Sequence, residues 1–146
     1  MSAARLRIVL LIDAVYSTVT GALLLAGTWD GLYDALDLPQ GQPAIFVQIG
    51  GALLWGIAYL LWLASRTPAL MLPVARAAAL MNGITMVILV VWLVHGELGI
   101  GTLGDVLLIA SAAVSALFTA LYLQAGVRSG GYGPEPPPPP DAPSSI

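Results

Sequence analysis

Four long apolar runs, separated by short polar stretches, dominate this chain. They cover residues 8–27, 44–64, 77–94 and 106–123. An α-helix rises about 1.5 Å per residue and the hydrocarbon core of a bilayer is about 30 Å thick, so each run can cross it with its interfacial turns included. The pattern predicts an all-α, polytopic membrane protein, built as an antiparallel four-transmembrane-helix bundle.

The stretch between the first two runs has a pattern of its own. Leu32, Tyr33 and Leu36 recur at helical spacing between carboxylates, and Pro39 follows them. This spacing predicts a short interfacial helix in the first outer loop, with Trp29 and Tyr33 at the level of the lipid headgroups.

The basic residues lie at alternate connections between the runs. All five are arginines: Arg5, Arg7, Arg66, Arg76 and Arg128. Because positive charge is retained in the cytoplasm during insertion, this pattern predicts that both termini are cytoplasmic. The absence of Lys beside abundant Ala, Gly and Leu is typical of a GC-rich bacterial genome, so we expect the bacterial cytoplasmic (inner) membrane.

The composition narrows the possible partners and cofactors. With 58% apolar and 9% charged residues, the chain lacks the polar surface of a soluble domain, so its main partner is the lipid bilayer. No basic face is available for nucleic acid. The absence of cysteine excludes disulfides, thiolate metal sites and iron–sulfur clusters. We expect no metal and no cofactor.

The chain divides into a membrane domain and a tail. Residues 1–127 form the predicted transmembrane domain, and the inner loop at 65–75 is short enough to make the second and third spans antiparallel neighbours. Residues 128–146 include five consecutive prolines, which predicts a disordered, proline-rich cytoplasmic tail.

One ionisable residue, Asp13, lies well inside a run, where a charge costs about 2.5 to 3.5 kcal/mol near the middle of an inserted helix. Counting from the cytoplasmic boundary places Tyr59, Asn82 and Thr119 at about the same depth, roughly 8 Å. Ser17 follows Asp13 by one helical turn on the same face. These five residues form the candidate intramembrane polar site.

Two interpretations of this site are open. In the functional one, the residues line a small polar cavity in which Asp13 exchanges a proton or a cation. In the structural one, Asp13 bonds Asn82 or Tyr59, or reaches Arg76. We favour the structural interpretation because polar and small side chains are the ordinary packing material of membrane helices. The sequence contains no specific catalytic motif, so we predict no enzymatic activity.

The layout over residues 8–123 resembles that of DoxX and the DoxX-like four-helix membrane proteins. The resemblance rests on Leu38-Pro39, Gly50-Gly51, Gly56, Arg66 and the Ala-rich segment 77–81. DoxX proteins typically carry a Glu in the second span, where this chain offers Gln48, so no site residue is carried over. Together with the missing catalytic motif, this resemblance favours a non-enzymatic inner-membrane protein of DoxX-like type, which we interpret as an accessory or partner subunit of a larger membrane complex.

The alternative is a small proton-coupled transporter, or a lipophilic-ligand (quinone or lipid) binding protein, that uses Asp13. Residues 56–62 are similar to a motif of small multidrug resistance transporters, which also carry an acidic residue in the first span. Here the motif lies in the second span, and the one-sided arginines disfavour dual topology. As partners besides the bilayer, we expect another membrane protein or further copies of this chain in a homo-oligomer.

Overall fold

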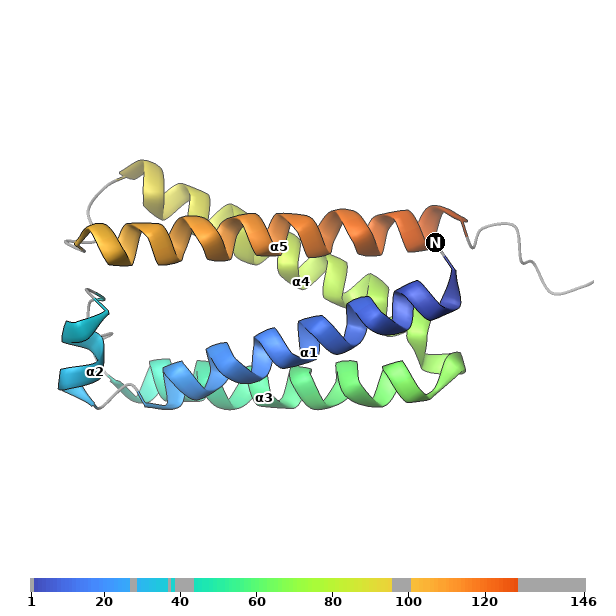
Figure 1. Ribbon diagram of the computed structural model, residues 1–146, viewed down its shortest axis with the longest axis horizontal. Helices are drawn as coiled ribbons and strands as arrows, with labels where there is room; N and C mark the ends of the chain where they lie inside the picture. Colours follow the sequence, from blue (N-terminus) through green and yellow to red (C-terminus); the bar gives the residue numbers. More distant parts are fainter. Residues whose placement is uncertain (1, 27–28, 37, 39–43, 96–100, 129–146) are drawn as a thin grey trace, which may run out of the picture.

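The computed structural model describes residues 2–26, 29–36, 38, 44–95 and 101–128, and most of them are in helices (Figure 1). The elements in chain order are α1 (Ala3–Leu25), α2 (Asp30–Ala35), α3 (Ala44–Arg66), α4 (Pro68–His95) and α5 (Thr102–Arg128). The four long helices pack antiparallel, and each is long and apolar enough to cross a membrane. The predicted fold is confirmed, and the chain is a multi-pass membrane protein. Of the predicted tail, only Arg128 is among the described residues.

The link between α3 and α4 is much shorter than predicted. The expected inner loop at 65–75 is wrong, since α3 ends at Arg66 and α4 begins at Pro68. Pro68 starts the helix because the first helical position needs no N–H donor. The amide of Thr67 donates to the carbonyl oxygen of Ala64 at 3.2 Å, which closes the turn. The second and third spans are therefore joined by a single residue.

The short helix predicted between the first and second spans is confirmed as α2. Its Tyr33 is buried, and the hydroxyl donates to the carbonyl oxygen of Leu23 near the end of α1 at 3.3 Å. Burial raises the pKa of Tyr33 above its ordinary value near 10, so the hydroxyl stays protonated and able to donate. Trp29, just before α2, is exposed.

The long helices form two pairs, α1 with α3 and α4 with α5. In the first pair, Gly21 and Gly51 let the two backbones touch. A Cβ at Gly51 would lie 2.7 Å from the Gly21 carbonyl oxygen and 2.8 Å from the Leu25 amide nitrogen. The Trp55 indole N–H also donates to the Thr18 carbonyl oxygen at 3.1 Å. This pair is held by close backbone contact, as is common between membrane helices.

The buried core lies at one end of the bundle, which we call the arginine end. It comprises the start of α1, the α3–α4 link and the end of α5, to the right in Figure 1. The buried apolar residues clustered there are Leu6, Val9, Leu10, Ala14, Leu61, Ala64, Met71, Ala75, Ala78, Ala79, Phe118, Tyr122 and Ala125. From Leu80 to His95, no residue of α4 is buried. The two helix pairs therefore pack on each other mainly at the arginine end.

Gly51→Ala is expected to destabilise the protein by about 1 to 3 kcal/mol or more, because the new methyl group meets backbone atoms that cannot move aside. Gly56→Ala is the matched control on the same helix, since a Cβ there has nothing within 4 Å. The measurement is the unfolding transition of each purified variant in mild detergent. Equal transitions for the two variants would contradict the close α1–α3 contact.

Candidate functional site

Asp13 lies at the centre of a hydrogen-bonded cluster that joins three helices. Its side chain is 2% exposed. One carboxylate oxygen accepts from the Tyr122 hydroxyl of α5 at 2.8 Å and from the Asn82 side-chain amide of α4 at 3.2 Å. The other accepts from the Ser17 hydroxyl, one turn along α1, at 3.4 Å. We call Asp13, Ser17, Asn82 and Tyr122 the polar cluster.

The helices position the polar cluster through their regular spacing. Asp13 and Ser17 lie four residues apart, so they share the face of α1 that is directed away from lipid. The Asn82 amide donates to the Ala78 carbonyl oxygen at 3.0 Å as well, which holds it against its own helix. Each polar group thus finds a partner inside the protein, as lipid could not supply one.

Thr119, also predicted for this site, contributes to the α4–α5 contact beside the cluster. Its hydroxyl lies 2.9 Å from the Ser115 carbonyl oxygen and 3.5 Å from that of Ala79 on α4. The structure therefore brings two of the predicted residues, Ser17 and Asn82, to the carboxylate of a third, Asp13, and places Thr119 on the neighbouring helix contact.

Tyr59 is not brought to the cluster. Its side chain is 60% exposed and stacks on Trp62, with ring centroids 5.9 Å apart. Both residues line an open groove of about 610 Å³ on the surface of the α1–α3 pair, the α1/α3 groove. The guanidinium of Arg66 lies 4.2 Å from the centre of the Trp62 ring, so the two side chains form a cation–π contact.

Tyr122 was missing from the predicted site, although it makes the shortest hydrogen bond to Asp13. It follows Ser115 and Thr119 at helical spacing, which was a usable signal. A span that ends at 123 would place it at the membrane boundary. Because α5 continues to Arg128, Tyr122 lies more than a turn inside the helix and is buried.

The polar cluster is a hydrogen-bonded contact between α1, α4 and α5. Asp13, Ser17 and Tyr122 are buried, and the donors of the cluster all point at the same carboxylate. No group of three or more His, Cys, Asp or Glu that could hold a metal occurs in the part of the chain that the structure describes. What this arrangement does chemically is satisfy a carboxyl group that would otherwise be costly inside a membrane.

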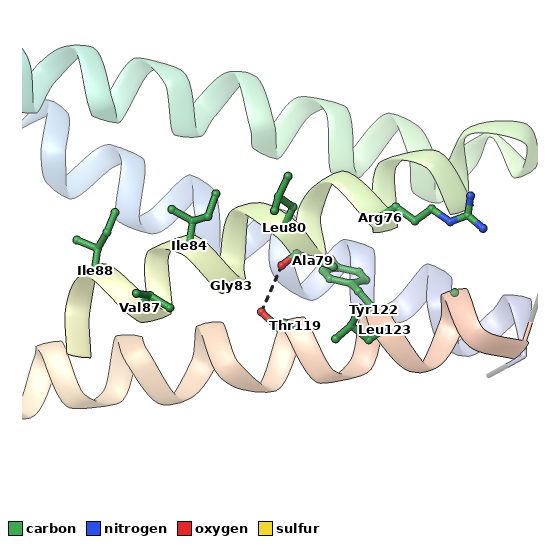
Figure 2. Close-up of a pocket in the computed structure, with 11 residues that line it drawn as sticks. Arg76, Ala79, Leu80, Gly83, Ile84, Val87, Ile88, Thr119, Tyr122 and Leu123 are labelled. Atoms are coloured by element: carbon green, nitrogen blue, oxygen red, sulfur yellow. Dashed lines mark hydrogen bonds between the residues drawn. The ribbon is translucent and has the colours of Figure 1, made fainter. Parts of the chain in front are cut away.

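A second groove, the α4/α5 groove, runs along the other helix pair (Figure 2). It has a volume of about 700 Å³ and is lined mainly by apolar side chains, including Ile84 and Ile88. The ring of Tyr122 forms part of its wall, and Arg76 lines it at the arginine end. Such a volume falls within the range of about 300–1,000 Å³ that is typical of small-ligand sites.

Comparisons with protein-family models, with curated proteins and with solved structures give no significant match. No family is therefore identified for this chain.

Tyr122→Phe removes the shortest bond of the cluster and is expected to cost about 0.5 to 2 kcal/mol of stability. Tyr16→Phe is the matched control. Tyr16 packs on Phe118 across the same interface, with ring centroids 6.1 Å apart, and its hydroxyl has no hydrogen-bond partner among the described residues.

The measurement is the unfolding free energy of both variants, alone and combined with Asp13→Asn. The stability changes of Tyr122→Phe and Asp13→Asn should not add in the double variant, whereas those of Tyr16→Phe and Asp13→Asn should add. If the stability changes add for both tyrosines, the claim that Tyr122 is bonded to Asp13 across the contact is wrong.

Proposed function

We propose that this chain is a non-enzymatic protein of the bacterial inner membrane that acts as an accessory or partner subunit of a larger membrane complex. In this proposal the arginine end faces the cytoplasm, as the positive-inside bias predicts. The polar cluster is then the contact that shapes the subunit, and binding to another membrane protein is its activity.

The observation that carries the proposal is Gln48 on α3. Gln48 is half-buried near the start of a membrane-spanning helix, and its side chain has no hydrogen-bond partner among the described residues. A half-buried amide is costly without a partner, and Gln side chains commonly bond across membrane helices. A neighbouring chain that offers an acceptor or a donor would satisfy it.

The unequal packing of the bundle supports the same proposal. α4 has no buried residue after Ala79, and Thr85 lies exposed in that half of the helix. Lipid covers apolar side chains as well as protein does, so the apolar exposure alone identifies no partner. The polar groups Gln48 and Thr85, both outside the polar cluster, are what favour a protein neighbour.

The transporter alternative finds no support among the described residues. Proton exchange at Asp13 would need contact with water, whereas the carboxylate is 2% exposed and closed in by Tyr122, Asn82 and Ser17. We therefore assign Asp13 a structural role within the proposal.

The orientation can be tested by cysteine labelling, since the natural chain contains no cysteine. Ala69→Cys, exposed at the arginine end, should react with a membrane-impermeant maleimide only after the cells are opened. Asp34→Cys, exposed on α2, should react in intact spheroplasts. The reverse labelling pattern would overturn the proposed orientation.

The partner role is tested by purifying the tagged full chain from its native membranes in mild detergent and measuring the mass of the particle. We expect a hetero-oligomer in which one further membrane protein is present in fixed ratio. Gln48→Leu should lower the yield of that protein, whereas Gln124→Leu, an exposed glutamine of α5 near the arginine end, should not. A particle that contains only this chain, monomeric or dimeric, would refute the accessory role.

A further inference from the structure

The α4/α5 groove carries a charge at one end and apolar side chains along the rest. Leu80, Ile84, Val87 and Ile88 line it from α4, and Arg76 lies at its arginine end (Figure 2). A groove of this kind matches a ligand with one anionic end and one hydrocarbon end.

The guanidinium of Arg76 is available to such a ligand. Arg76 is exposed, and it forms no hydrogen bond or ion pair with another described residue. Arg66 differs, because its guanidinium already lies over the ring of Trp62. Of these two arginines near the α3–α4 link, Arg76 lines the α4/α5 groove, and its charge has no partner among the described residues.

The depth of Arg76 fits a lipid phosphate. It precedes Asn82 by six residues, so it lies about 9 Å nearer the membrane boundary than the polar cluster. The continuous apolar stretch of α4 begins directly after it, at residue 77. Arginines at this level attract anionic headgroups, and their side chains extend toward the interface.

Two glycines of the groove, Gly83 and Gly126, have room beside them for a larger side chain. A Cβ at Gly126 would have nothing within 4 Å, and one at Gly83 would lie 3.7 Å from Thr119, an ordinary contact. Gly21 and Gly51 differ, because backbone atoms fill the space beside them. The absence of side chains at Gly83 and Gly126 therefore leaves volume in the groove that larger residues could fill.

We propose that the α4/α5 groove binds one anionic phospholipid, with an acyl chain along α4 and α5 and the phosphate on Arg76. Phosphate and guanidinium form charge-assisted hydrogen bonds, for which Arg geometry is well suited. The lipid site is independent of the proposed partner role and of the orientation of the chain.

Native mass spectrometry of the purified full chain tests the site directly. The protein is mixed in detergent with equal amounts of phosphatidylglycerol and phosphatidylcholine, and the lipids that remain bound are counted. We expect one phosphatidylglycerol per chain to be retained in preference. Arg76→Gln should lower its affinity about fivefold, the effect of one basic residue near a lipid headgroup, and Arg76→Lys should retain most of the preference.

Gly83→Leu tests the apolar half of the site, since the added side chain would occupy the groove and should reduce retention of the lipid. The matched controls are Arg66→Gln, which removes an arginine outside the groove, and Gly56→Leu, which adds the same side chain on α3. Both controls should bind phosphatidylglycerol as the natural chain does.

Several results would overturn the lipid site. These are equal retention of phosphatidylcholine, an equal loss with Arg66→Gln, and unchanged binding with Gly83→Leu. A dimer that excludes lipid would identify a second copy as the occupant of the groove. Because the readout is lipid retention by a single chain, a failure of the accessory role would leave this result unaffected.

Discussion

The bundle depends on the need to satisfy one carboxyl group inside a membrane. Asp13 belongs to α1, yet the Tyr122 and Asn82 donors come from α5 and α4. Since lipid offers no hydrogen bonds, the α1–α3 pair can bury Asp13 only where the α4–α5 pair reaches it. That requirement sets the depth and the place at which the two pairs meet. The buried apolar residues surround the same point, so the core and the polar cluster are one contact.

The two ends of the bundle are held by different means. At the arginine end, side chains of all four long helices pack together. Toward the other end, α1 and α3 remain in contact through Gly21 and Gly51, and Tyr33 fixes α2 to the end of α1. The second half of α4 has no buried residue. Packing between the two helix pairs is therefore concentrated at the arginine end. The exposed surfaces toward the other end are available to lipid and to other chains.

The fold and most of the candidate site were predictable because the signals are local. Hydropathy determines a span, and the rise of a helix determines depth, so Asp13 and Asn82 could be placed at one level before their bond was known. Depth carries no information about rotation about the helix axis, which is why Tyr59 was grouped with residues that it does not face. The contact of Gly21 with Gly51 depends on which helices become neighbours, and a single sequence does not contain that information. Tyr122 was left out of the predicted site because the apolar run ends at residue 123, whereas α5 continues to Arg128.

The polar cluster and the α4/α5 groove share structural parts. Tyr122 donates its hydroxyl to Asp13 while its ring forms part of the groove wall. Asn82 and Arg76 lie on the same helix, so the depth of the cluster also sets the level of the arginine at the end of the groove. An amphipathic side chain such as tyrosine allows this arrangement because its polar tip and apolar body can serve two surfaces. The interaction that joins the helix pairs therefore also positions the apolar surface that the bundle presents to its surroundings.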